Sequence, residues 1–192
     1  METAEAILSA ARAAFERRGL EGLSLRVIAK KVGITPMAIY RHYANKQALI
    51  DALVLDALDA WSARVAAIAP APPLEWLPRI WNSHLEFALG EPRRYEAAFL
   101  LHSRRARRYP DDFVAGRSPA GQLQLQLIAT LMEQGVLRAP SAIEVMIMTS
   151  GLAQGLITLY RAGRIAGGED EFRALYRRAM TRCFETFAEA PT

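Results

Sequence analysis

Apolar residues recur at helical spacing along almost the whole chain. In the first segment, one face carries Ile7, Leu8, Ala11, Ala14 and Phe15. A repeat of three to four residues predicts an amphipathic helix, whereas a half-buried strand would alternate apolar and polar residues. The sequence shows no sustained alternation of that kind. The pattern therefore predicts an all-α protein.

Capping residues divide the first third of the chain into four predicted helices. Gly19 and Gly33 stand where a helix commonly ends in the left-handed conformation. Ser24, Thr35 and Asn45 stand where a side chain can cap the helix that follows. At about 1.5 Å per residue, the fourth helix spans roughly 35 Å and is long enough to belong to two domains. The four helices are predicted at residues 3–18, 25–32, 36–43 and 46–68.

Glycine and proline divide the remainder into five further predicted helices and one linker. The segment from residue 104 to residue 118 is predicted to be irregular, because it combines clustered charges with a proline and a glycine. We expect the helices at about residues 74–89, 92–104, 119–135, 140–162 and 169–188.

The longest uncharged run, residues 145–160, contains Thr149, Ser150 and Gln154. We expect this run to be too short and too polar to cross a membrane. The N-terminus lacks the positive flank of a secretory signal, and the single cysteine, Cys183, excludes an intramolecular disulfide. The sequence therefore predicts a cytoplasmic protein without a membrane partner.

The charge of the chain is concentrated near its N-terminus. Residues 1–47 hold eight Lys or Arg and four Glu, while residues 48–192 hold 16 of each sign. A small basic segment beside a neutral one favours an anion-binding head on a separate body, and DNA is the first partner to consider. The other interpretation is chance, since four charges are few. We predict a DNA-binding domain at residues 1–47 and a body at residues 48–192.

Residues 24–43 give the strongest local signal in the sequence. Two short capped helices flank a turn of three or four residues with Gly33 near its centre, which is the anatomy of a helix-turn-helix. Ala29 precedes Gly33 by four residues, where a small side chain lets the two helices pack closely. Four aliphatic side chains can fill the seam between the helices, namely Ile28, Val32, Ile34 and Ile39.

The side chains that remain outside this seam have chemistry suited to DNA. Hydroxyl, imidazole and ammonium groups can bind phosphates and position the protein without reading sequence. Arginine can pair bidentately with guanine, and small apolar groups can pack on a thymine methyl. The alternative is that the two arginines are ordinary surface charges. The predicted phosphate contacts are Ser24, Thr35, Tyr40, His42, Tyr43 and Lys46, and the predicted base contacts are Arg26, Pro36, Met37, Ala38 and Arg41.

Roughly residues 4–50 resemble the tetracycline-repressor (TetR) family of bacterial transcriptional regulators. The resemblance rests on Ile7-Leu8-x-Ala10-Ala11 with Phe15 and Gly19, on Leu25-Arg26-x-Ile28-Ala29-x-x-Val32-Gly33, and on Ala38-Ile39-Tyr40-x-His42-Tyr43 followed by Lys46-x-x-Leu49. It implies an all-helical homodimer with a three-helix DNA-binding head, a long fourth helix, and a body that binds a small molecule releasing the DNA. It also implies the base contacts named above and the phosphate contacts of Ser24, Thr35, Tyr40, His42 and Lys46. Pro36-Met37 departs from the family, because many members place hydrogen-bonding side chains there.

Small residues in the body predict a dimer interface. Gly151 and Gly155 lie one turn apart and would let another helix approach closely. Close packing inside one protomer is the alternative. The predicted interface comprises Gly151, Leu152, Gly155, Leu159, Phe184 and Phe187.

A ligand pocket is predicted from aromatic and polar residues that share helix faces in the body. An apolar cavity with a few polar groups is typical of small-molecule sites, although such stripes also form plain core. The sequence has no concentrated acidic cluster, which favours a hydrophobic or weakly polar effector over a multiply cationic one. The predicted lining is Trp81, His84, Tyr95, Phe99, His102, Met146 and Thr149.

The sequence as a whole predicts a ligand-responsive repressor that binds an inverted repeat as a homodimer. Two other classes of protein are the alternatives. An enzyme is disfavoured, because the sequence has no Gly-rich phosphate loop and no His-Glu-x-x-His pair. His42, His84 and His102 are too scattered for a local metal motif, so we expect neither a metal nor a cofactor. A helical protein-interaction module would use Arg104 to Arg108 as a basic patch, but Asp111 and Asp112 follow closely.

Overall fold

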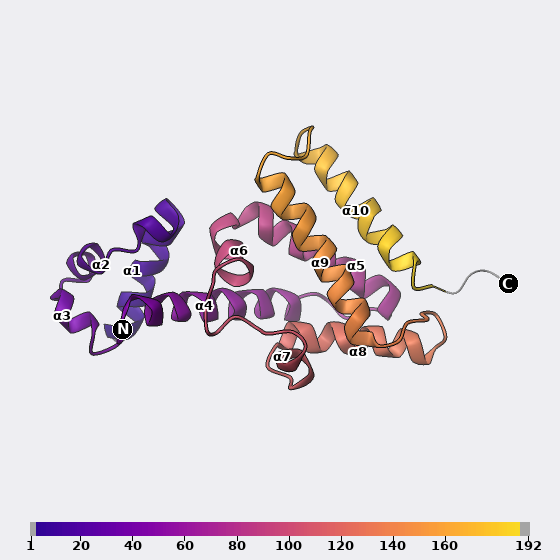
Figure 1. Ribbon diagram of the computed structural model, residues 1–192, viewed down its shortest axis with the longest axis horizontal. Coiled ribbons are helices and arrows are strands. Elements are labelled where there is room, and N and C mark those ends of the chain that lie inside the picture. The colour runs from indigo at the N-terminus through magenta and orange to yellow at the C-terminus, as the bar shows by residue number, and fades with distance from the viewer. Residues whose placement is uncertain (1–2, 189–192) are drawn as a thin grey trace. The chain divides into compact units, whose positions relative to one another are not determined.

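The structure is a computed structural model that describes residues 3–188. Within that range the chain forms helices and one isolated β-bridge, with no strand, which confirms the all-α prediction. The elements are α1 (Thr3–Arg18), the 3₁₀-helix η1 (Gly19–Gly22), α2 (Leu25–Val32), α3 (Pro36–Ile39), α4 (Lys46–Ala66), α5 (Pro73–Gly90), α6 (Pro92–Phe99), α7 (Asp111–Val114), α8 (Pro119–Glu133), α9 (Ala142–Arg161) and α10 (Glu169–Glu185) (Figure 1).

These helices form two compact units. The first comprises residues 1–61 and 91–106, and the second comprises residues 62–90 and 107–192. Helix α4 contributes to both, because its last turn belongs to the second unit. The domain boundary predicted after residue 47 lies at the start of α4, inside the first unit.

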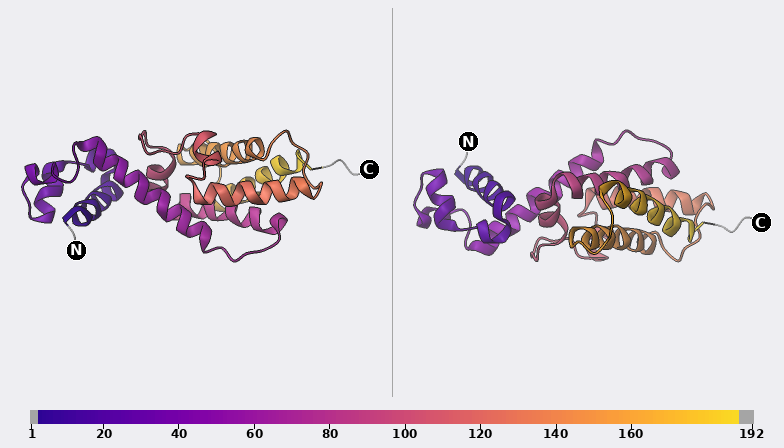
Figure 2. Two further views of the ribbon diagram at one scale, coloured as in Figure 1. Left: turned by 90° about the horizontal axis from the view of Figure 1, so that it is seen from below. Right: turned by 90° about the horizontal axis from the view of Figure 1, so that it is seen from above.

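In the first unit, α1, α2 and α3 gather beside the N-terminal part of α4 (Figure 2). The face of α1 that the sequence pattern selects is largely buried, with Ile7 and Ala11 fully so. Of the four residues predicted to fill the seam between the two short helices, Ile28 and Ile39 are at most 1% exposed, whereas Val32 and Ile34 are only half-buried. Ala29, the small residue predicted to allow close packing, is fully buried. Burial of these apolar side chains holds the helix-turn-helix together.

Most of the predicted caps form. Gly19 and Gly33 adopt left-handed φ angles of 58° and 78°. The Thr35 hydroxyl oxygen accepts a hydrogen bond from the Ala38 amide at 3.2 Å, and the Asn45 side-chain oxygen accepts one from the Ala48 amide at 2.8 Å. Ser24 occupies the cap position of α2, but its side chain makes no capping bond.

Helix α3 is shorter than the predicted residues 36–43. It ends at Ile39, after which the amides of Tyr40, Arg41 and His42 each bond to the carbonyl three residues earlier. Such bonds tighten the chain into 3₁₀-type turns, so the α-helix does not continue. The residues from 40 to 43 therefore lie on a tight turn rather than on a helix.

In the second unit, α5, α8, α9 and α10 pack together around an apolar core. The helices predicted there are confirmed, with ends shifted by a few residues. The segment predicted as an irregular linker is partly regular, because α7 lies within it. Asp112 stabilises this segment by accepting hydrogen bonds from the Arg108 amide and the Arg117 guanidinium, both at 2.6 Å.

Helix α9 requires a correction to the expectation drawn from residues 145–160. The whole helix has 20 residues, and an 18-residue window within it has a mean hydropathy of 1.5, so by length and composition alone it is long and apolar enough to cross a membrane. The uncharged run covers only part of the helix, which is why it looked too short. In the structure α9 packs against α8 and α10 and buries Val145, Met146, Thr149, Ala153 and Ile157.

Candidate nucleic-acid interface

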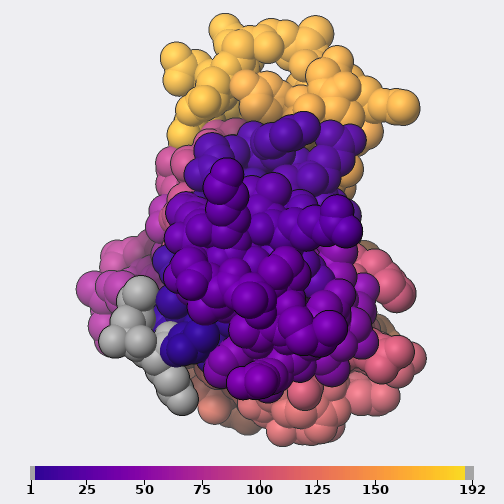
Figure 3. All heavy atoms as spheres, turned by 90° about the vertical axis from the view of Figure 1, so that its left-hand side faces the viewer, coloured from indigo at the N-terminus to yellow at the C-terminus, as the bar shows by residue number. Residues whose placement is uncertain are grey.

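The outer face of α2 and α3 carries the residues predicted to bind DNA. Burial of Ile28, Ala29 and Ile39 directs one face of each helix inward and leaves the opposite face accessible. Arg26, Met37 and Tyr40 are exposed, and this side of the unit faces the viewer in Figure 3. The fold therefore presents base-reading and phosphate-binding candidates to solvent together.

The five predicted base-contact residues do not share one environment. Arg26, Pro36, Met37 and Arg41 are exposed, and 73% of the Met37 surface is accessible. Ala38 is half-buried, and its amide is occupied by the Thr35 hydroxyl. The side chains with the longest reach are thus the two arginines and Met37.

Among the predicted phosphate contacts, Thr35, Tyr40, His42 and Lys46 are exposed, while Ser24 is half-buried. Ser24 and Thr35 directly precede α2 and α3, while Tyr40 and His42 lie on the turn after α3 and Lys46 begins α4. Hydroxyl, imidazole and ammonium groups at these positions can meet a phosphate backbone.

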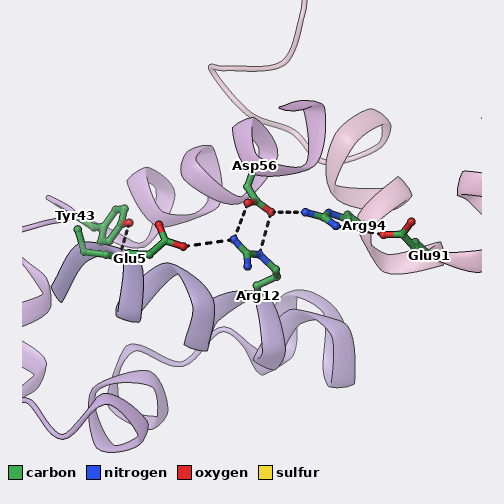
Figure 4. A network of polar contacts seen from close by, with 7 residues as sticks. Glu5, Arg12, Tyr43, Asp56, Glu91 and Arg94 are labelled. Carbon is green, nitrogen blue, oxygen red and sulfur yellow. Dashed lines mark hydrogen bonds and ion pairs between the residues drawn. The ribbon is translucent and has the colours of Figure 1, made fainter. Parts of the chain in front are cut away.

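Tyr43 is engaged within the protein. Its hydroxyl donates to the Ala4 carbonyl at 3.2 Å and so ties the turn after α3 to α1 (Figure 4). Burial, with a further contribution from Glu5, raises the pKa of Tyr43 above its ordinary value. The phenol is therefore neutral at physiological pH and serves as a hydrogen-bond donor.

The positive charge of this surface is not offset by acidic residues of the same segment. Residues 22–50 contain five Lys or Arg and no Asp or Glu. The five are all exposed, namely Arg26, Lys30, Lys31, Arg41 and Lys46. A surface of one sign without compensating carboxylates suits a polyanion.

A partly buried network of ion pairs positions α1 within the first unit (Figure 4). Arg12 of α1 makes two hydrogen bonds to the Asp56 carboxylate of α4, at 2.6 and 3.0 Å. Arg94 of α6 approaches the same carboxylate at 3.4 Å and also pairs with Glu91. The sequence analysis did not single out Asp56, because it is one of three carboxylates on α4, beside Asp51 and Asp59, and nothing local distinguishes it.

The predicted ligand-binding residues are divided between the two units. In the first unit Tyr95 is buried with its ring 5.0 Å from that of Phe99, while His102 is exposed. In the second unit Trp81, His84, Met146 and Thr149 are all buried.

Two polar groups in this set have defined states. The Thr149 hydroxyl donates within its own helix, with the Val145 carbonyl oxygen at 2.9 Å. Burial lowers the pKa of His84 to about 4, so its imidazole is neutral at physiological pH.

A cleft of about 130 Å³ in the second unit is lined by Trp81 together with Tyr176 and Met180 of α10. Within residues 3–188, no three His, Cys, Asp or Glu side chains gather as a metal site requires.

The predicted dimer residues of α9 lie on an exposed apolar face. Gly151 and Gly155 are exposed, Leu159 is 44% exposed, and a Cβ atom added at either glycine would meet nothing within 4 Å. Leu152, Phe184 and Phe187 are half-buried, and the Phe184 ring packs edge-on against Trp81. Met148, which is 53% exposed, extends this face by one turn. Its spacing from Leu152, Gly155 and Leu159 was the signal that sequence reasoning missed.

Comparison with known proteins identifies both parts of the chain. A family profile for bacterial regulatory proteins of the tetR family matches residues 7–53. A profile for the tetracyclin repressor-like C-terminal domain matches residues 77–183, more than half of the chain. The chain belongs to the TetR family. It is therefore a TetR-family transcriptional regulator with a helix-turn-helix DNA-binding domain, and the resemblance drawn from the sequence is confirmed.

Individual relatives match only part of this TetR-family chain. It is 41% identical over 49 residues to the HTH-type transcriptional regulator UidR of Escherichia coli (strain K12), which is 26% of the chain and 25% of UidR. It is 35% identical over 82 residues to the HTH-type transcriptional repressor KstR2 of Mycobacterium tuberculosis, which is 42% of the chain and 41% of KstR2. The chain thus spans only about a quarter of the length of UidR.

The solved structure of RolR in complex with its ligand resorcinol has the same fold. It superposes with a TM-score of 0.68 and 15% identity over 95% of this chain and 87% of RolR. At this identity the likeness shows the fold of a TetR-family protein and nothing finer.

Proposed function

We propose that this TetR-family regulator is a homodimeric, ligand-responsive repressor that binds an inverted-repeat operator in the cytoplasm. The observation that carries the proposal is the acid-free segment of residues 22–50, whose five basic side chains stand exposed on a helix-turn-helix. Repression is favoured because one relative, KstR2, which matches 42% of the chain, is itself a repressor.

A homodimer is supported by the exposed face of α9. An exposed apolar stripe on this helix comprises Met148, Gly151, Gly155 and Leu159. If α9 of a second copy packed against it, the stripes of both protomers would be buried. Two copies of α3 would then enter successive major grooves. The half-sites of the operator should accordingly lie about one helical turn apart, or a little more.

Release by a small molecule is supported by the cleft of about 130 Å³ beside Trp81 in the body and by the ligand complex of RolR, which has the same fold. Buried His84 and Thr149 add only uncharged polar groups at neutral pH, so a hydrophobic or weakly polar effector fits best. The effector would favour a conformation in which the two heads no longer match the half-site spacing.

The first experiment is fluorescence anisotropy on the DNA upstream of the protein's own gene, with excess random duplex and two salt concentrations. We expect binding that resists the competitor. If that fragment fails, selection from a random duplex pool follows, and failure to enrich any sequence would contradict the proposal.

The same anisotropy assay tests whether a small molecule releases the operator. Compounds that raise the thermal stability of the protein are added to the complex, and release of the operator is expected. An operator affinity that is unchanged by every confirmed ligand would contradict ligand-responsive repression and leave specific DNA binding intact.

A further inference from the structure

Met37 is the most exposed large apolar side chain within residues 3–188, at 73%. Val27 and Tyr40 are 55% and 48% exposed, so three such side chains fall within a basic segment of 14 residues. Single exposed apolar residues are common on protein surfaces. Three within a segment that lacks any carboxylate point to a partner that is both anionic and locally apolar.

The fold fixes the outward direction of Met37. Ile39 is fully buried, and residues two positions apart on an α-helix point to nearly opposite sides. The Ala38 amide donates to the Thr35 hydroxyl, which holds the start of α3 in place. Met37 therefore cannot turn inward without breaking the seam and the cap.

The major groove of DNA offers one apolar group that matches this surface. Thymine carries a 5-methyl group there, whereas cytosine carries hydrogen at that carbon. Neither Pro36 nor Met37 has a side-chain hydrogen-bond donor, and the methionine side chain is flexible and polarisable. The basic residues around them supply the attraction to phosphate.

We propose that Met37 reads the 5-methyl group of a thymine in each operator half-site, with Pro36 packed beside the same base edge. This inference rests on the proposed function and adds which chemical group sets the base preference at α3. Hydrogen-bonded reading of bases then falls to Arg26 and Arg41, and 5-methylcytosine substitutes for thymine better than cytosine does.

The test replaces single thymines by uracil, which removes the methyl group and keeps the pairing. The full chain first selects its operator from a random duplex pool, and each thymine is then exchanged in turn. Burial of one methyl group predicts about fourfold weaker binding at the contacted position in one half-site, and about 15-fold when both half-sites are changed. In Met37→Ala the thymine and uracil duplexes should bind equally.

Two further variants make the result specific. Met37→Gln keeps the length of the side chain but replaces its apolar end, so it too should lose the preference for thymine over uracil. Val114→Ala removes a side chain that is 70% exposed in the second unit, and it should keep the preference. Circular dichroism verifies that each variant is folded.

The outcomes distinguish a failure of methyl reading from a failure of the proposed function. Specific binding without any effect of uracil would overturn methyl reading, and an effect that persists in Met37→Ala would overturn the role of Met37. If no duplex is enriched at all, the proposed function fails and methyl reading fails with it.

Discussion

At the residue scale, position decides what a charged side chain can do. Lys46 is exposed at the first residue of α4, directly after the Asn45 cap. Arg26 is exposed on α2, on the side opposite the buried seam. We propose that Lys46 binds phosphate and that Arg26 reaches a base edge, so their removal should have different consequences.

Lys46→Ala should weaken binding to every duplex by a similar factor. A phosphate contact releases about one counterion, so the slope of log K against log salt should fall by roughly one. Anisotropy titrations on operator and random DNA measure this. Arg79→Ala, an exposed arginine of the second unit, serves as control, and an unchanged slope in Lys46→Ala would remove the phosphate assignment.

Arg26→Ala should instead lower the affinity for the operator selectively. Loss of a bidentate contact to guanine costs about 1–3 kcal/mol and relaxes the preference at one base pair of each half-site. Binding to a panel of single-base operator variants tests it. Equal losses on operator and random DNA would show that Arg26 does not read a base.

His84 links stability to pH. Its pKa is lowered by burial to about 4, so the unfolded chain binds a proton more readily than the folded chain. Stability is complete above the unfolded pKa of about 6.5 and falls as the pH drops toward 4, by up to about 2 kcal/mol near pH 5. Urea unfolding between about pH 7 and pH 5 measures the loss, and His84→Leu should flatten it. An equal slope in both proteins would contradict this assignment.

At the element scale, the carboxylate of Asp56 joins three helices of the first unit. It accepts hydrogen bonds from Arg12 of α1 and Arg94 of α6 while standing on α4. The side chain of Asp56 is only 20% exposed, so solvent screens these contacts less than it screens surface pairs. The orientation of α1, and with it of the helix-turn-helix, depends on this node.

Asp56→Asn should therefore destabilise the first unit by about 1–3 kcal/mol, because two guanidinium groups lose their charged acceptor. Urea unfolding followed by circular dichroism reports the change. Glu75→Gln breaks an exposed pair with Arg79 in α5 and should change stability by less than about 0.5 kcal/mol. Equal effects of the two substitutions would contradict the role given to Asp56.

At the scale of the whole molecule, we propose that a second copy covers the exposed apolar face of α9. Gly155→Arg should abolish the dimer, because a Cβ atom added there meets nothing within 4 Å in its own protomer and the arginine would lie where the partner helix approaches. Analytical ultracentrifugation should show a monomer. Operator affinity should fall about 100-fold or more, since each head then binds alone.

The matched control for this prediction is Gln126→Arg, which adds the same charge at an exposed position of α8. It should leave both the dimer and the operator affinity unchanged. A dimer that survives Gly155→Arg would move the interface away from α9.

The sequence by itself determined the all-α class, the helix-turn-helix and most of its caps. These features depend on residues within about four positions of one another, which is the reach of helical periodicity and capping. Gly19, Gly33, Thr35 and Asn45 accordingly do what their positions predict.

Only the tertiary structure decided which polar and exposed groups are available for function. The Tyr43 hydroxyl is bound to Ala4, 39 residues away, and Asp56 meets an arginine 44 residues away. No local pattern encodes such pairs, because their partners are set by how helices pack. For the same reason the exposure of Met37, on which base reading depends, followed from the burial of Ile39 in a seam built with another helix.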